Sequence, residues 1–259
     1  MLSARLGAML AAGLLVAGIA SAARAADEDP DAWHATITPS VWAAGLYGDV
    51  TVRGHDAELD VGFLDLLEET DTLVGLQGRL EVTRGRLGVY TDVFYVKTKV
   101  VDAGTTGLDA ETRMWFVEFG ALYRLLDARD ERVPGFTLDV YGGGRYNFLE
   151  LDLDTAGTPS INQSKDWIDP IVGARVTVHF SEHVFLLVGG DVGGFGVGSD
   201  FAWSVLGLVG YKWQTGTAEW AVLAGYRALG EDYTTGSGVR HFRWDTTMHG
   251  PVLAFSARF

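Results

Sequence analysis

Apolar and polar residues alternate with a period of two over most of this 259-residue chain. Such a period gives a β-strand two different faces. Ten intervals carry the alternation, at residues 35–47, 73–83, 87–97, 112–125, 138–148, 167–180, 184–194, 201–213, 218–229 and about 243–259. The sequence therefore predicts an all-β protein of about ten strands in one domain. Eight and twelve strands are the alternatives, because alternation fixes strand ends only loosely.

Short and long connections follow one another between the predicted strands. The short ones lie near residues 84, 130, 182 and 215, and the longer ones at 48–72, 101–110, 150–166, 195–200 and 230–243. Short turns at one end and long loops at the other are typical of antiparallel up-and-down barrels in bacterial outer membranes. Within the acidic segment 48–72, residues 63–69 predict a short amphipathic helical turn.

The distribution of apolar residues separates a membrane barrel from a soluble one. The chain is 47% hydrophobic, yet after the first 25 residues no apolar run approaches the ~18 residues that a membrane helix requires. Apolar strand faces end in rings that favour a headgroup boundary, and the predicted aromatic girdle is Trp115, Tyr123, Trp203, Tyr211, Trp213, Trp220 and Tyr226. We therefore predict a transmembrane β-barrel; the alternative is a soluble β-sandwich or lipocalin-like barrel.

The opposite strand faces carry charges of both signs in equal number. The predicted lumenal charge network consists of Arg79, Glu81, Asp92, Glu118, Arg124, Asp139, Arg145, Asp169, Arg175, Asp191, Arg227 and Arg258. Buried charges need partners, because an isolated one costs several kcal/mol. We expect ion pairs that hold a narrow barrel in shape. A gated or selective ion path is the alternative.

Both ends of the chain carry export signals. Arg5, the uncharged run 6–20 and the Ala23-Arg24-Ala25 site predict a signal peptide over residues 1–25, which leaves a barrel domain over residues 26–259. At the other end, Leu253, Phe255 and the terminal Phe259 alternate with small or polar residues. This pattern resembles the C-terminal strand by which the barrel assembly machinery recognises bacterial outer-membrane proteins. It implies a location in the outer membrane.

Composition excludes several classes of partner and chemistry. The formal net charge is −14, and loss of Arg5 and Arg24 with the signal peptide takes it to −16. Nucleic acid is therefore not an expected partner, because phosphate binding needs clustered Lys and Arg. The chain has no Cys, which excludes disulfides, thiolate metal sites and a Cys nucleophile. No cofactor motif is present. Residues 193–198 are rich in Gly, but no Gly-Lys-Ser/Thr follows, so a phosphate loop is rejected.

Two groups of side chains are candidates for a chemical site. His241, Asp245 and His249, with Asp232 before them, offer a His–Asp pair for a general base, but Gly-x-Ser-x-Gly and His-Glu-x-x-His are both absent. We therefore predict no enzyme. The acidic residues of 48–72 are suitable ligands for Ca²⁺ or Mg²⁺. Their order lacks the Asp-x-Asp-x-Asp-Gly pattern, so a solvated loop is favoured and no metal site is predicted.

Taken together, the signal peptide, the ten alternating segments and the terminal Phe259 resemble the small outer-membrane barrels of Gram-negative bacteria, the broad OmpA and OmpW superfamily. The resemblance implies an integral outer-membrane protein with a structural, surface-interaction or narrow-conductance role. A channel or transporter for small or hydrophobic solutes is the alternative, and a hydrolase at the barrel rim is the third hypothesis. Expected partners are outer-membrane lipids, lipopolysaccharide and the barrel assembly machinery. The pattern does not indicate an oligomeric state.

Overall fold

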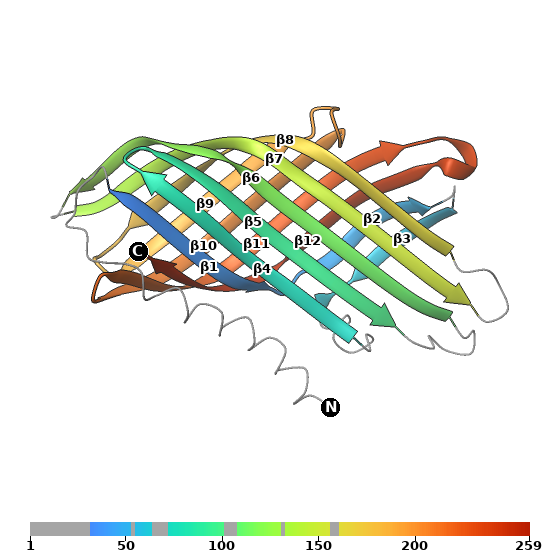
Figure 1. Ribbon diagram of the computed structural model, residues 1–259, viewed down its shortest axis with the longest axis horizontal. Helices are drawn as coiled ribbons and strands as arrows, with labels where there is room; N and C mark the ends of the chain where they lie inside the picture. Colours follow the sequence, from blue (N-terminus) through green and yellow to red (C-terminus); the bar gives the residue numbers. More distant parts are fainter. Residues whose placement is uncertain (1–31, 53–54, 64–71, 101–107, 131–132, 156–160) are drawn as a thin grey trace.

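The computed structural model describes residues 32–52, 55–63, 72–100, 108–130, 133–155 and 161–259 (Figure 1). The predicted signal peptide, residues 1–25, lies outside these ranges. So does most of the predicted helical turn, residues 64–69.

Over the described ranges the chain forms strands and one short 3₁₀ helix. The strands are β1 (Trp33–Trp42), β2 (Gly45–Val52), β3 (His55–Val61), β4 (Thr72–Arg84), β5 (Leu87–Val100), β6 (Leu108–Asp130), β7 (Val133–Thr155), β8 (Ile161–His179), β9 (Val184–Gly193), β10 (Phe201–Thr215), β11 (Ala218–Thr235) and β12 (Phe242–Arg258). The 3₁₀ helix η3 (Gly238–Arg240) precedes β12. Within these ranges no helix is both long and apolar enough to cross a membrane.

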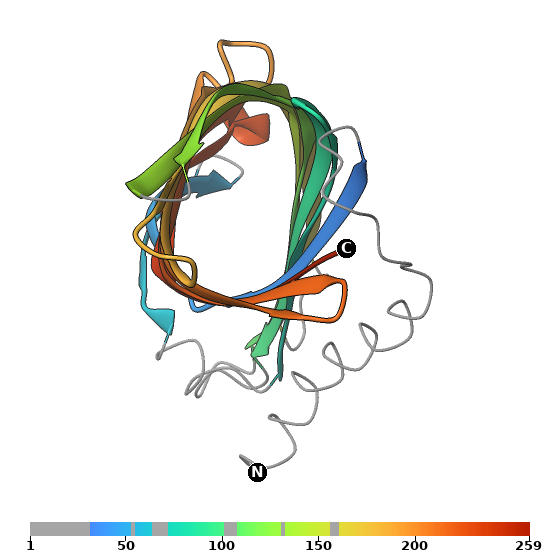
Figure 2. The same ribbon diagram turned by 90° about the vertical axis from the view of Figure 1, so that its left-hand side faces the viewer.

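Each strand from β4 to β12 pairs antiparallel with the next, and β12 pairs with β1, which pairs with β4. The sheet is therefore a closed barrel, visible end-on in Figure 2. β1 and β2 follow one another along β12, and β3 adds to β2. Eleven of the twelve strands thus fill ten positions around the ring, and β3 extends the sheet beside β2. This confirms the predicted ten-strand up-and-down barrel.

The barrel closes where the first strand meets the last. Ala35 donates its N–H to the carbonyl of Phe259 at 3.1 Å, and Phe259 donates back to Ala35 at 2.9 Å. The ladder is interrupted between β1 and β2 at residues 43–44, opposite Pro251. A proline has no N–H to give, so one bond remains here, from Ala43 N–H to the Pro251 carbonyl at 2.9 Å.

The start of β1, the end of β12 and the short turns lie at one end of the barrel, on the left in Figure 1. Short turns face the periplasm in bacterial barrels, so this is the periplasmic end and the other is the external end. Four predicted loops are wrong in detail at the external end. Segment 150–166 contains the end of β7 and the start of β8, and segment 101–110 contains the start of β6. Segment 48–72 contains the end of β2 and all of β3, and segment 230–243 contains the last residues of β11, which runs to Thr235.

The outer wall of the barrel is apolar. Val172, Val209 and Leu253 are each more than half exposed, the reverse of a soluble protein, in which such residues gather inside. On β10 the apolar face runs from Trp203 to Trp213, about the 9–11 residues that a tilted strand needs to span a bilayer. Where β1 pairs with β12 and with β4, the ring has no unpaired backbone edge, as a lipid environment demands.

The polarity of the two faces reverses beyond this apolar belt. At the external end of β12, Arg243 and Asp245 face outward, while Phe242, Trp244 and Met248 are buried inside. The outside of the barrel there meets water, so the apolar residues turn inward as in a soluble protein. The resulting apolar plug consists of Trp42, Val50, Phe94, Met114, Phe116, Leu149, Trp167, Leu229, Phe242, Trp244 and Met248.

Candidate functional site: the lumenal ion network

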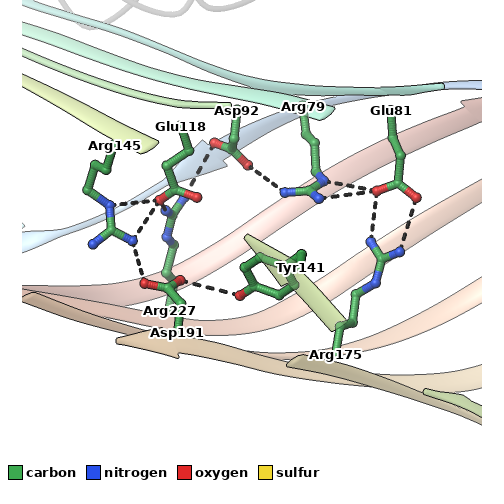
Figure 3. Close-up of polar contacts among 9 residues, drawn as sticks. All are labelled: Arg79, Glu81, Asp92, Glu118, Tyr141, Arg145, Arg175, Asp191 and Arg227. Atoms are coloured by element: carbon green, nitrogen blue, oxygen red, sulfur yellow. Dashed lines mark hydrogen bonds and ion pairs between the residues drawn. The ribbon is translucent and has the colours of Figure 1, made fainter. Parts of the chain in front are cut away.

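The middle of the lumen holds a network of arginines and carboxylates, shown in Figure 3. Its most buried member is Arg145 on β7, whose side chain has no exposed surface. Arg145 donates from Nε and Nη2 to Glu118 Oε1 at 3.1 and 3.0 Å, and from Nη2 to Asp191 Oδ1 at 2.8 Å. One guanidinium thus joins strands β6, β7 and β9 across the interior.

Two further arginines extend the network toward β4. Arg227 on β11 donates to Glu118 Oε1 at 2.9 Å and lies 3.6 Å from Asp92. Arg79 on β4 lies 3.9 Å from Asp92 and 3.2 Å from Glu81. Asp92 and Glu118 are neighbours of like charge in the register of β5 and β6, and Arg227 reaches both from the opposite wall.

The network continues toward the periplasmic end through Arg175. This side chain from β8 donates to both oxygens of Glu81, at 2.9 and 3.0 Å, and to Asp139 Oδ2 at 2.7 Å. Arg124 donates to the other oxygen of Asp139 at 2.9 Å. Most of the arginines therefore bridge two carboxylates, which is the geometry that offsets the cost of removing these charges from water.

Strand register explains several of these pairs. Glu118 stands opposite Arg145, and Asp139 stands opposite Arg175. Directly opposite side chains on one face lie about 4.5–5.5 Å apart at Cβ, close enough to interact. Asp169 also stands opposite Arg145, but Arg145 turns to Glu118 and Asp191 instead.

Asp169 was predicted to belong to the network, and the geometry corrects this. Its side chain is fully buried, and no cation among the described residues lies within ion-pair distance of it. It accepts hydrogen bonds from Asn147 Nδ2 at 2.9 Å, from Trp167 Nε1 at 3.2 Å, and from the N–H and hydroxyl of Ser199 at 2.6 and 2.8 Å. Asp169 thus ties the loop after β9 to the barrel wall.

Arg258 was also predicted to join the network, and it stays apart from it. It stands opposite Glu219 in the register, but the Glu219 carboxylate accepts a hydrogen bond from Lys212 Nζ at 2.8 Å. Among the described residues no carboxylate lies within ion-pair distance of Arg258. The structure thus brings ten of the twelve predicted charges together.

Aromatic rings that the sequence analysis did not assign to the site connect the network to its surroundings. Tyr141 donates its hydroxyl to Asp191 at 3.3 Å. Arg79 lies over the ring of Tyr90 at 4.2 Å, and Arg227 lies over Trp42 at 5.1 Å. Trp42 belongs to the apolar plug, so a cation–π contact joins the two parts of the lumen. The sequence signal that could have identified these rings is their position on the inward face of the strands.

The apolar plug fills the lumen on the external side of the network. Trp42 packs edge-on against Phe94, with ring centroids 5.1 Å apart, and Phe94 lies 5.9 Å from Phe116. Trp167 stacks on Tyr233 at 4.1 Å with nearly parallel planes. The four plug rings among these are all less than a tenth exposed.

On the periplasmic side of the network lies a cavity of about 300 Å³. Its floor is formed by network side chains such as Glu118 and Arg227, and its rim by Lys212 and Arg258. Polar side chains line one part of its wall and apolar side chains the other. A cavity therefore lies on the periplasmic side of the network, and packed apolar side chains lie on its external side.

The predicted girdle residues lie on the outer wall. Trp115, Tyr123 and Tyr211 are 37–53% exposed, and Trp203, Trp213 and Trp220 are partly exposed. Tyr226 differs from these, because it stands opposite Gly207, near the middle of the Trp203–Trp213 interval. Its hydroxyl is hydrogen-bonded to His249 Nδ1 at 2.7 Å, so its polar end is satisfied by protein.

The predicted assembly-signal residues also face outward. Leu253 and Phe255 are 59% and 38% exposed, and Phe259 is partly exposed. Trp220 lies 5.5 Å from Phe255 and 6.2 Å from Phe259, ring centroid to centroid. These rings form one aromatic patch at the periplasmic border of the belt.

Two of the residues considered for a hydrolase are held by other side chains. Asp245 is paired with Arg243. His249 is bonded to Tyr226 and stacks on Tyr47, with ring centroids 4.5 Å apart. Over the described part of the chain, no three His, Asp or Glu side chains gather as metal ligands.

No protein-family model and no curated protein matches the chain. Solved structures are similar in fold. The attachment invasion locus protein Ail of Yersinia pestis is 11% identical over 88% of this chain and 98% of that chain, with a TM-score of 0.38. A major outer membrane protein from Thermus thermophilus is 15% identical over 88% and 100%, with a TM-score of 0.40. The toluene transporter TodX of P. putida is 9% identical over 89% and 91%, with a TM-score of 0.28.

The membrane placement of this chain follows from its own geometry. Its ring of strands is closed, its outer wall is apolar over the span of a bilayer, and within that span its charges are inside. The chain is therefore an integral outer-membrane β-barrel protein.

Proposed function

We propose that the protein is a closed barrel that does not conduct ions and that has a structural and surface-interaction role in the outer membrane. The ion network backed by the apolar plug carries this proposal. An ion crossing the lumen would have to break bridged pairs such as Arg145–Glu118 and then displace packed rings such as Trp42 and Phe94. Conducting barrels instead keep a water-filled, polar path.

Planar-bilayer recording on purified, refolded protein tests this proposal. We expect no reproducible openings in a concentrated KCl solution, because packed rings such as Trp42 and Phe94 lie across the lumen beyond the ion network. Folded protein is verified beforehand by its altered mobility on a gel without heating. Steady openings of uniform size from such protein would overturn the proposal and favour the narrow-conductance role.

Lipopolysaccharide is the proposed partner of the outer wall at the external border of the belt. Lys97 Nζ lies 2.8 Å from Glu111, and Arg113 lies 2.6 Å from Glu111 and 2.8 Å from Glu150. This outward-facing cluster lies next to Trp115, at the level where lipid headgroups begin. Its cations can meet sugar phosphates directly, and its carboxylates can meet them through divalent cations. Loss of lipopolysaccharide co-purification in a Lys97→Gln/Arg113→Gln variant is the expected result.

A transporter of small or hydrophobic solutes is the second candidate function. The observation that favours it is an unpaired seam near the external end. Over the described residues β3 pairs with β2 alone, and residues 72–76 of β4 pair with β5 alone. An apolar solute that entered the plug region would find a lateral way into the lipid here. Uptake of a labelled apolar solute that depends on this protein, measured in cells with and without it, distinguishes the two candidates.

A further inference from the structure

We propose that the periplasm-facing cavity binds a small amphipathic anion, an alkyl chain that carries one carboxylate or phosphate group. This inference goes beyond the proposed closed barrel and does not depend on it, because the cavity lies on the periplasmic side of the network.

The cavity has two chemically different walls. Strands β9 to β12 supply an apolar wall, formed by Phe185, Leu187, Leu206, Leu208, Ala221, Leu223, Val252 and Ala254. Strands β1 and β4 to β8 supply a polar wall that includes Thr38, Gln77 and Thr177. The lumen of a bacterial barrel is ordinarily polar. The same strands also contribute polar side chains, such as Ser204 and Ser256, at the borders of this wall. An apolar stretch of this size is not needed for a salt-bridged lumen, whereas an alkyl chain requires one.

The charge of the expected head group follows from the pairing of the cations. Six cationic side chains that line the cavity have a carboxylate within ion-pair distance: Arg79, Arg124, Arg129, Arg175, Lys212 and Arg227. Arg258 lines the same cavity and has none among the described residues. Glu219 stands opposite Arg258 in the register, but its carboxylate accepts a hydrogen bond from Lys212 instead. A guanidinium without a carboxylate, at the rim of a cavity, is suited to an anionic group.

The position of Arg258 sets the orientation of the ligand. On β12 the inward positions alternate from Arg258 at the rim through Ser256 to Ala254 and Val252 deeper inside. An anion at Arg258 thus directs its chain along the apolar wall toward Leu208 and Leu223. The cavity volume of about 300 Å³ is at the lower limit of small-ligand sites, which run from about 300 to 1,000 Å³. A short alkyl chain fits this limit better than a complete lipid.

Equilibrium binding to the full barrel in lipid nanodiscs tests the proposal. Radiolabelled octanoate and octyl phosphate are the two probes, and empty nanodiscs of the same lipid correct for partition into the bilayer. Inorganic phosphate and octyltrimethylammonium test whether the chain and the negative charge are each required. We expect saturable binding of at least one octyl anion at one site per barrel, and none of the other two compounds. The two octyl anions together show whether carboxylate or phosphate is preferred.

Variants locate the site. Arg258→Gln should weaken binding at least about tenfold, the equivalent of one lost charge-assisted contact, while Arg258→Lys should retain most of it. Leu223→Asn should weaken it through the apolar wall. Arg86→Gln, in the exposed turn at the same end, is the control and should leave binding unchanged. All variants must show the mobility of the folded barrel. Equal binding of the alkylammonium, or full binding by the folded Arg258→Gln protein, would overturn the proposal.

Discussion

Arg145 on β7 donates from two nitrogens to a single oxygen of Glu118 on β6, its direct neighbour in the sheet register. The same guanidinium also donates a hydrogen bond to Asp191 on β9. All three residues are buried. The pair is therefore part of a desolvated unit, in which the loss of one charge leaves the opposite charges with fewer partners.

Arg145→Met is expected to lower the free energy of unfolding by about 3–5 kcal/mol, because it leaves Glu118 and Asp191 buried with too little positive charge. Urea unfolding in lipid vesicles, followed by tryptophan fluorescence, measures the loss. Arg113→Met is the matched control: its side chain is 38% exposed, and exposed pairs contribute about 0–1 kcal/mol. Equal losses in the two variants would show that the network does not stabilise the barrel.

Asp169→Ala is expected to loosen the loop at residues 194–200. The carboxylate holds the backbone N–H and hydroxyl of Ser199, and a hydrogen bond to a charged group contributes about 1.5–3 kcal/mol. Hydrogen exchange of the amides of 194–200 should become faster, with little change in the strands on the periplasmic side. Asp200→Ala, whose side chain is exposed, should leave exchange unchanged. If the amides of the loop stay protected from exchange in Asp169→Ala, the turns of the loop itself, and not Asp169, keep it ordered.

Gly173→Ala is expected to hinder folding. A Cβ at this position would lie 2.5 Å from the carbonyl oxygen of Gly190 and 2.5 Å from the ring of Tyr141. Relieving such contacts costs about 1–3 kcal/mol or more, and here it also displaces the hydroxyl that binds Asp191. Gly207→Ala is the control, because a Cβ there meets nothing within 4 Å. The yield of the folded form on an unheated gel should fall only for Gly173→Ala.

Val209→Arg tests the contact with lipid. Val209 is 55% exposed and lies between Trp203 and Trp213 on the outer face of β10. Arg at the bilayer midplane of a barrel costs about 2–4 kcal/mol, so folding into vesicles should weaken by that amount. Thr217→Arg, in the turn beyond the belt, should have almost no effect. A tolerated Val209→Arg would contradict a hydrocarbon environment at this position.

The strands and the direction of their side chains could be predicted because one face meets lipid. Within the belt, a two-residue period puts Val209 and Leu253 outside and Glu118 and Arg145 inside, as observed. The two-residue period arises because one strand face contacts lipid and the other faces the lumen. The count of ten ring positions followed from the same signal and from the turns.

Beyond the belt the same signal was harder to interpret. The sequence 56–61 alternates acidic and apolar residues strictly, yet its acidity indicated a loop, and the structure has β3 there. Glu150 to Asp154 alternate in the same way and extend β7. Outside the membrane the outer face is polar and the inner face apolar, so a rule based on an apolar exterior cannot find where strands end.

The partners inside the lumen could not be predicted from the alternation. The period shows that Arg145, Asp169 and Asp191 all point inward, but not that Arg145 takes Asp191 rather than Asp169. That choice depends on distances across the barrel, between residues 46 positions apart in the sequence. It also depends on Ser199 and Trp167, which donate hydrogen bonds to the carboxylate of Asp169.

The ion network also bears on how the barrel avoids being misassembled. A slip of one residue between neighbouring strands turns every side chain of the shifted strand to the opposite face. For β7 such a slip would turn Asp139 and Arg145 toward the hydrocarbon and leave their former partners in the lumen without them. A slip would therefore raise the free energy of the barrel at several strands at once, so the buried charges favour the correct register of the strands.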